Sequence, residues 1–182
     1  MLEIAHRGYS ERYKDNSKEA IIAAKTFHFD LIEIDVQLTY DKKIILFHDI
    51  YINKKLIENL TLEKIKKEDK TILEFSELKN IIDISKTKIC LDIKGTNKEI
   101  CNILYQELDK QFIHNYLLSS FNFPIMEELY KINPNLNLGL ISSNIFSKEN
   151  FIYFLSNIKI KFVCLDRKST RLNSSHTVIS YA

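Results

Sequence analysis

The chain has 182 residues, 45% of them hydrophobic, which is typical of one globular domain with a sizeable core. A net charge of +2 is too small to indicate binding to nucleic acid or to an anionic membrane. The sequence has no apolar run of the about 18 residues that a membrane span needs and no signal-peptide pattern, so we expect a cytoplasmic protein with reduced cysteines.

Short apolar segments alternate with segments of helical periodicity along the chain. We expect strands at residues 2–5, 30–38, 43–48, 88–95, 116–121, 136–141 and 160–165. We expect helices at residues 17–27 with Ser17 as the cap, two short ones within 60–85 with Ser76 capping the second, and others at 97–112, 125–133 and 147–157. This alternation, with nearly continuous apolar strands, predicts a parallel sheet covered by helices.

The number of strands indicates the kind of α/β fold. About six of them suit a TIM (β/α)8-type barrel, which needs roughly 250 residues when complete. Residues 43–48 follow the preceding strand after a short turn, so we expect them in a hairpin outside the barrel. The sequence therefore predicts an incomplete TIM barrel over residues 1–165. An open doubly wound sheet is the alternative, because alternation alone does not separate the two folds.

Residues 166–182, DRKSTRLNSSHTVISYA, differ in composition from the rest of the chain. They are rich in serine and arginine and show no periodicity. Back-translated, most of this segment resembles a common sequencing-library adapter. We therefore expect residues 166–182 to be a non-native tail and leave them out of the fold prediction. A disordered polar tail is the alternative.

Charged residues lie at or near the ends of the predicted strands, where α/β proteins collect their active groups. They are His6, Arg7, Glu33, Asp35, His48, Asp49, Asp92 and Lys94. Residues two positions apart share one face of a strand, so Glu33 and Asp35 point together, as do Asp92 and Lys94. In a barrel that shared face is the interior.

Three of these side chains, Glu33, Asp35 and Asp92, are carboxylates that converge on one barrel mouth. Like charges at short range raise one another's pKa, and a divalent cation is a common compensation. An all-oxygen ligand set suits Mg²⁺, Ca²⁺ or Mn²⁺. The sequence therefore predicts a metal site. The alternative is a structural ion network in which the carboxylates pair with Arg7 and Lys94.

His6 and His48 each end a predicted strand and adjoin a second polar residue. Two histidines beside a cation suit phosphoryl chemistry, because one can take a proton from the nucleophile while the other gives one to the leaving oxygen. Arg7 can hold a phosphate in a fork, and Lys94 adds a point charge. We expect Asp49 to orient His48.

In this order and spacing, the motifs resemble those of the glycerophosphodiester phosphodiesterase family. They are HRG at 6–8, DNS at 15–17, EIDVQLTYD at 33–41, FHD at 47–49, DIK at 92–94 and SSF at 119–121. The resemblance implies a (β/α)8 barrel with a small helical insertion after the HD motif, at about residues 51–85. It also implies hydrolysis of a glycerophosphodiester to sn-glycerol 3-phosphate and an alcohol, with Mg²⁺ or Ca²⁺ as the cofactor.

Carried over by position, the resemblance implies a role for each charged residue. His6 and His48 match the acid/base pair, and Arg7 and Lys94 match the phosphate-binding cations. The metal ligands match Glu33, Asp35 and Asp92. Asn16 matches the Asn of the family's Glu-Asn motif, and we expect a structural role for it.

The chain departs from the family pattern in several places. Asp92 stands where the family usually has Glu, Asp15 stands in place of the Glu before Asn16, and the last two strands and a Trp motif are missing. We therefore expect the intact gene product to be an enzyme acting on a small molecule, and the chain as printed to be inactive or barely stable. The alternatives are a lysophospholipase D-like phosphodiesterase and a non-catalytic fragment or binding module.

Overall fold

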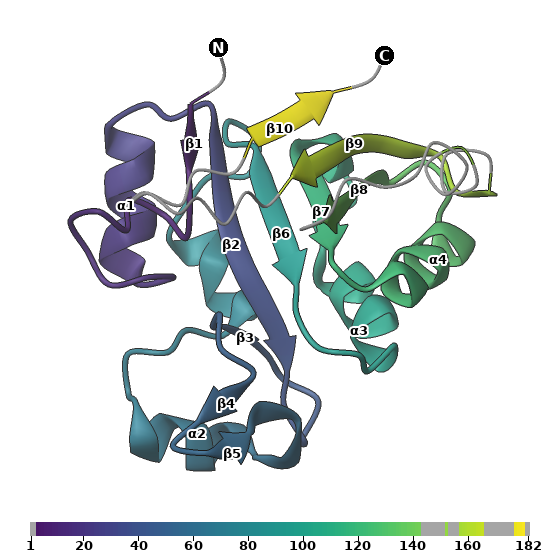
Figure 1. The fold of residues 1–182 in the computed structure, drawn as a ribbon. Coiled ribbons are helices and arrows are strands. Elements are labelled where there is room, and N and C mark those ends of the chain that lie inside the picture. Colours follow the sequence, from purple (N-terminus) through teal and green to yellow (C-terminus); the bar gives the residue numbers. More distant parts are fainter. Residues whose placement is uncertain (1–2, 143–151, 153–156, 166–176, 181–182) are drawn as a thin grey trace.

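A computed structural model describes residues 3–142, 152, 157–165 and 177–180 of the chain. Six parallel strands within these residues pair in chain order in one curled sheet (Figure 1): β1 (Ile4–Ala5), β2 (Leu31–Leu38), β6 (Ile89–Ile93), β7 (Tyr116–Ser120), β8 (Asn137–Ser142) and β9 (Ile160–Leu165). A doubly wound sheet reverses its strand order at a switch point, whereas this order does not reverse. The predicted incomplete barrel is therefore confirmed.

Two further strands pair with this sheet in the antiparallel sense. β3 (Ile44–Leu46) pairs with β2 and lies outside the order of the parallel strands, which confirms that residues 43–48 form a hairpin outside the barrel. β10 (Thr177–Ser180) pairs with β9, with Thr177 opposite Leu165. β10 lies inside the segment that we expect to be a non-native tail, and that expectation stays a prediction.

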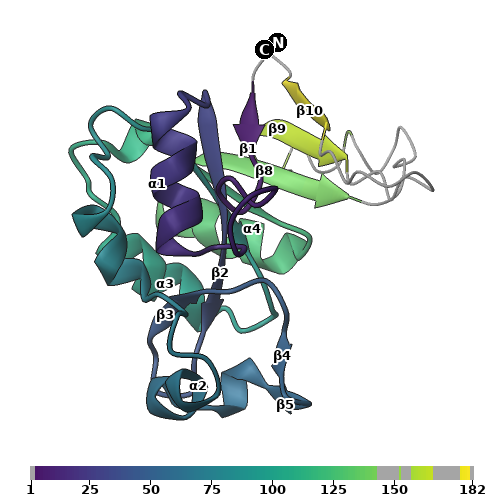
Figure 2. The ribbon, with the colours of Figure 1, turned by 90° about the vertical axis from the view of Figure 1, so that its left-hand side faces the viewer.

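Helices cover the outer face of the sheet. α1 (Lys18–Thr26) follows β1 and begins as predicted, because the Ser17 hydroxyl accepts a hydrogen bond from the amide of Ala20. α3 (Glu99–Glu107) and α4 (Phe123–Ile132) follow β6 and β7. In Figure 2, α1 and α3 lie on the opposite side of β2 from β9 and β10. The predicted helix at residues 147–157 falls mostly outside the described residues.

One main core joins these helices to the outward-facing side chains of the strands. Ile34, Leu91 and Leu118 are fully buried in it, together with Ile21 and Leu104 from α1 and α3. Because alternate residues of a strand face opposite ways, burying these apolar side chains directs Glu33, Asp35 and Asp92 to the inner face. The packing of the core therefore determines where the charged residues lie.

Among the described helices none is both long and apolar enough to cross a bilayer.

The insertion between β3 and β6 contains β4 (Tyr51–Ile52), β5 (Lys55–Leu56), η1 (Ile57–Asn59), α2 (Leu62–Glu68) and η2 (Phe75–Asn80). The part with β4, β5 and α2 lies beyond the carboxyl end of β2 in Figure 1. Ile52, Ile57, Leu60, Ile65 and Ile72 of the insertion form a second apolar cluster with Ile45 of β3, whereas Phe75 and Leu78 of η2 belong to the main core. The first part of the insertion, up to Ile72, thus has a separate apolar cluster beside the barrel mouth.

The prediction for the end of this insertion was wrong in two details. η2 is a 3-10 helix, and its cap is Glu74 rather than Ser76. Glu74 and Glu77 form a reciprocal capping box, in which the side chain of Glu77 accepts a hydrogen bond from the amide of Glu74. Glutamate is an uncommon first member of such a box, so the serine was the more obvious candidate.

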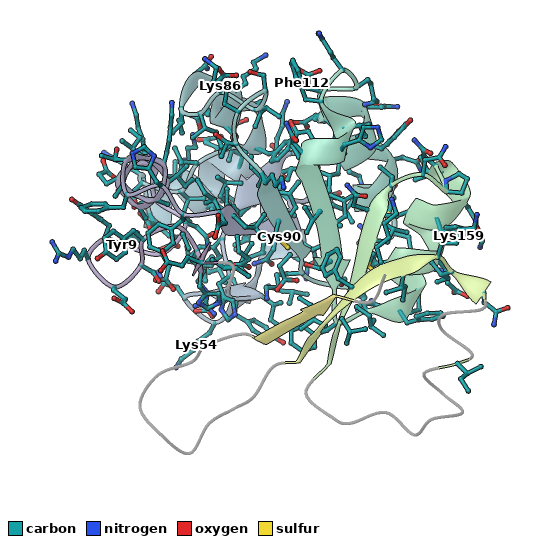
Figure 3. All side chains as sticks on the ribbon, turned by 90° about the horizontal axis from the view of Figure 1, so that it is seen from above. Tyr9, Lys54, Lys86, Cys90, Phe112 and Lys159 are labelled. Carbon is teal, nitrogen blue, oxygen red and sulfur yellow. The ribbon has the colours of Figure 1, made fainter. Side chains whose placement is uncertain are left out.

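The strand register defines a layer of inward-facing residues across the sheet. Asp35 lies opposite Asp92, Asp92 opposite Ser119, and Ser119 opposite Gly139. A Cβ at Gly139 would lie 2.0 Å from the ring of Phe162 on β9, so any larger residue there would require the ring to move. Figure 3 shows Cys90 on β6, two residues before Asp92, within the middle of the sheet. The two acids of this layer therefore come from neighbouring strands.

Candidate active site

β2 and β6 together supply the three carboxylates. Glu33 and Asp35 come from β2 and Asp92 comes from β6, directly opposite Asp35. One ligand atom of each of the three residues lies within 4.8 Å of those of the other two, and all three side chains are buried. The structure thus brings together the three predicted metal ligands, while their role as ligands stays a prediction.

Burial and mutual repulsion shift the pKa values of this cluster. Burial, followed by the charges of Asp35 and Asp92, holds the pKa of Glu33 well above its usual range. Burial also raises the pKa of Asp92 from 3.8 to about 6, although Lys94 partly opposes this. Burial acts on Asp35 in the same sense, but Lys94, Asn16 and His48 together outweigh it and lower the pKa of Asp35. The cluster therefore holds more negative charge than its surroundings neutralise.

Lys94, at the end of β6, provides the nearest positive charge. Its Nζ lies 2.5 Å from Oδ2 of Asp92 and 3.0 Å from Oδ1 of Asp35, and 5.6 Å from the ring centroid of Phe121. The ion pairs of the alternative structural network are thus present. Within the described residues, the buried Oδ1 of Asp92 accepts no hydrogen bond, and Oδ1 of Asp35 has Lys94 as its partner. A buried oxygen without a donor, in an all-oxygen set, fits a hard cation such as Mg²⁺ or Ca²⁺.

The HRG motif connects the first strand to this cluster. Gly8 has a φ of +74°, and a Cβ there would lie 2.7 Å from the backbone carbon of Ala20, so the turn requires glycine. This tight turn lets the amide of Arg7 donate a hydrogen bond of 2.8 Å to Oε2 of Glu33. His6 Nε2 lies 3.9 Å from the same oxygen. The motif therefore places His6 beside the acidic cluster, as expected for a site residue.

The guanidinium of Arg7 reaches two further carboxylates. Its Nη1 donates to Oδ2 of Asp15 at 2.8 Å, and its Nε lies 3.4 Å from Oδ2 of Asp35. The shorter Asp15, which stands where the family pattern has Glu, is long enough for this contact. Arg7 is thus held at the edge of the cluster with its side chain partly accessible, where an anionic ligand can reach it.

Asn16 holds Asp35 with both halves of its side-chain amide. Its Nδ2 donates to Oδ2 of Asp35 at 2.8 Å, and its Oδ1 accepts from the main-chain amide of Asp35 at 3.0 Å. Asn16 is 3% exposed and has a φ of +56°, a conformation that asparagine tolerates better than most residues. The structural role expected for Asn16 is therefore the orientation of one predicted metal ligand.

His48 lies in the loop after β3, at the same mouth. Its Nδ1 is 2.7 Å from Oδ1 of Asp49, the partner expected from the sequence. Electrostatic interaction with His48 contributes to the lowered pKa of Asp35 and partly opposes the rise in the pKa of Asp92, so the imidazole lies near the cluster. Both candidate histidines therefore lie beside the acids, but their catalytic role stays a prediction.

Gln37 was not singled out from the sequence, although it positions the loop that carries His48. Its Nε2 donates to the carbonyls of Phe47 and Asp49, each at 2.8 Å, and its side chain is buried. The available signal was its place on β2, two residues after Asp35 and therefore on the same inner face. A buried amide on that face can bridge the strand to a loop above it.

Fold and site together define a barrel-type α/β protein with an acidic, histidine-flanked cluster at the carboxyl ends of its strands. The model of the glycerophosphoryl diester phosphodiesterase family matches residues 6–177 of the chain. The chain therefore belongs to this family of phosphodiesterases. The match includes all the predicted site residues and extends past Leu165 into the segment expected to be a tail.

Individual relatives agree with this membership. A glycerophosphodiester phosphodiesterase of Caldanaerobacter subterraneus is 30% identical over 161 residues, which are 77% of this chain and 66% of that protein. The crystal structure of a glycerophosphodiester phosphodiesterase from Thermotoga maritima matches 90% of this chain and 73% of its own, with a TM-score of 0.75 and 24% identity. A phosphodiesterase of Oleispira antarctica in complex with the product sn-glycerol-3-phosphate has the same TM-score, with 22% identity over 90% of this chain and 74% of its own. These structures support the barrel fold.

Proposed function

We propose that the intact protein hydrolyses glycerophosphodiesters to sn-glycerol 3-phosphate and an alcohol, in the cytoplasm, with one Mg²⁺ or Ca²⁺ ion. The observation that carries this proposal is the convergence of Glu33, Asp35 and Asp92 within 4.8 Å, inside a chain of the phosphodiesterase family. The product complex of the Oleispira antarctica phosphodiesterase supports the same class of small molecule. The proposed metal ligands on this chain are the three carboxylates.

Each site residue has a proposed task. Arg7 and Lys94 bind the non-bridging oxygens of the phosphate through their positive charges. One of His6 and His48 removes a proton from the attacking hydroxyl, which belongs to water or to C2 of the glycerol, while the other protonates the departing alcohol oxygen. Asp49 holds Nδ1 of His48 and so leaves Nε2 for proton transfer. A cation bound by the carboxylates would neutralise charge that develops on the phosphate.

The 182-residue chain itself is proposed to turn over slowly or not at all. Within the described residues the sheet is open between β1 and β10, so it does not close into a barrel. An open sheet leaves one side of the mouth without strands that would exclude water from the substrate. A cation site made only from β2 and β6 does not need those strands, so binding is the sharper test.

The experiment is calorimetric titration of the purified chain with Ca²⁺ and Mg²⁺, together with thermal unfolding. We expect the wild-type chain to bind an ion and to unfold at a higher temperature with it. Glu33→Gln should lose both effects, whereas His48→Ala and the surface control Glu63→Gln on α2 should keep them. Absence of ion binding by the wild type, or full binding by Glu33→Gln, would contradict the metal assignment. Release of sn-glycerol 3-phosphate by the intact protein then tests the reaction.

A further inference from the structure

A groove leads away from the candidate site between the insertion and the loop that follows β6. A cavity of about 120 Å³ is lined by Lys94 and by Glu58, and an adjoining shallower cavity of about 420 Å³ shares Glu58, Thr96 and Asn97 with it. Lys94 also contacts Asp35 and Asp92. The groove therefore begins at a residue of the acidic cluster and continues outward past Glu58.

The first part of the groove has mostly apolar walls. Ile50 and Leu56 come from the insertion, and Leu38 and Ile100 come from the barrel and α3. Gly95 adds no side chain, and the space in which its Cβ would lie is empty to a distance of 4 Å. The volume is enough for several atoms of a small ligand, and the walls suit a short carbon chain.

The charge of the groove changes sign along its length. Lys94 is positive at the site, whereas Glu58 is an exposed carboxylate on η1 that belongs to no ion pair in the described part of the chain. Lys42 also lines the outer cavity, but it is paired with Glu99, and Lys55 of the insertion is paired with Glu68. A ligand with a negative group at Lys94 and a positive group further out would match this order of charges.

An aromatic side chain lies beside this carboxylate. Tyr40 lines the adjoining cavity together with Glu58 and is 67% exposed, so its ring is available to a ligand. A carboxylate and an aromatic ring in one groove suit an alkylammonium group, which is attracted by the charge and by the face of the ring. Neither feature offers anything to a neutral polyol beyond hydrogen bonds.

We propose that this groove binds the alcohol half of the phosphodiester and selects alcohols that carry an ammonium group, with Glu58 as the specificity-determining residue and Tyr40 as the aromatic wall. This inference rests on the proposed function, because the phosphate must lie near Lys94. A primary ammonium and a trimethylammonium are both cations that Glu58 and the ring of Tyr40 would attract. Aromatic rings bind quaternary ammonium groups in particular, so substitution of Tyr40 should weaken binding of the trimethylated ligand more than binding of the primary ammonium.

The test measures affinities of three ligands for the Ca²⁺-loaded chain: glycerophosphocholine, glycerophosphoethanolamine and the neutral-alcohol diester glycerophosphoglycerol. Where turnover occurs, the ratio of kcat/KM values replaces the ratio of Kd values. In Glu58→Gln we expect the affinity for both ammonium diesters to fall about fivefold, the size of effect that a partly exposed ion pair gives, and the affinity for glycerophosphoglycerol to stay within about twofold. Glu63→Gln, which removes an exposed charge outside the groove, should change none of the three.

The outcomes separate this inference from the function on which it rests. If the wild type binds all three diesters equally, or Glu58→Gln weakens all three equally, the groove proposal is overturned and the phosphodiesterase proposal stands. If the wild type binds Ca²⁺ but no diester, the groove proposal is overturned, and release of sn-glycerol 3-phosphate by the intact protein decides the phosphodiesterase proposal. Tyr40→Leu gives a second measurement, since it should weaken glycerophosphocholine more than glycerophosphoethanolamine, and equal loss of both would exclude the aromatic wall.

Discussion

Asp92→Asn should stabilise the protein in the absence of divalent ions. Burial raises the pKa of Asp92 from 3.8 to about 6, so its ionised form is disfavoured in the folded state. At about 1.4 kcal/mol per pKa unit, the charge on this one side chain costs the folded state about 3 kcal/mol at neutral pH. Asparagine keeps the shape and removes the charge, while Lys94 keeps Asp35 as a partner at 3.0 Å.

The effect has a defined pH dependence. Between about pH 4 and pH 6 the unfolded chain loses the Asp92 proton before the folded protein does, so the folded state binds more protons in that range. The stability of the wild type therefore falls as the pH rises through this window, and this part of the decline is absent from the variant. The advantage of Asp92→Asn should grow from near zero at about pH 4 to about 3 kcal/mol at pH 8.

Urea unfolding in the presence of a chelator measures this difference. Tyrosine fluorescence is a suitable signal because the chain has nine Tyr and no Trp. The surface control is Asp83→Asn, since hydrogen bonds with Ser85 lower the pKa of Asp83 and its neutralisation should not stabilise the fold. Saturating Ca²⁺ should stabilise the wild type more than Asp92→Asn. An Asp92→Asn variant that is less stable than the wild type at pH 8 without ions would refute the reasoning.

Two further substitutions test the packing around the site. Asn16→Ala removes both hydrogen bonds with Asp35 and places alanine at a φ of +56°, so the free energy of unfolding should fall by about 3 kcal/mol. In Asn16→Gly the loss should be about 1 kcal/mol smaller, because glycine relieves the backbone strain. Equal loss in the two variants would contradict the strain. Gly139→Ala puts a Cβ 2.0 Å from the Phe162 ring and should cost about 1–3 kcal/mol in urea unfolding. Phe162→Leu in the same chain should recover part of that loss, and simple additivity of the two changes would count against the clash.

Local signals in the sequence were sufficient for much of the fold. The apolar run that contains Glu33 and Asp35 is β2, and the serine before residues 18–26 caps α1 through its hydroxyl. Both depend on neighbours within a few residues. The capping box of η2 was missed because Glu74 acts as a cap only in the observed backbone conformation, which the residue type does not specify.

For the candidate site, too, the local arrangement was predictable from the sequence and the contacts between strands were not. Spacing places Glu33 and Asp35 on one face, but the position of Asp92 opposite Asp35 depends on the register between β2 and β6, which pairs residues far apart in the chain. The contact of Lys94 with both Asp35 and Asp92 has the same origin. The structure therefore contains the ion network and the acidic cluster at once, a combination that the sequence had presented as alternatives.

The separate apolar cluster of the insertion has an evolutionary consequence. Glu58 lies on the surface of a unit whose buried side chains, such as Ile57 and Ile65, contact one another rather than the main core. Substitutions on this unit can therefore change the shape of one wall of the groove without disturbing the strands that carry the acidic residues. Preference for a given alcohol and the capacity for phosphodiester chemistry could then diverge independently among descendants of one barrel.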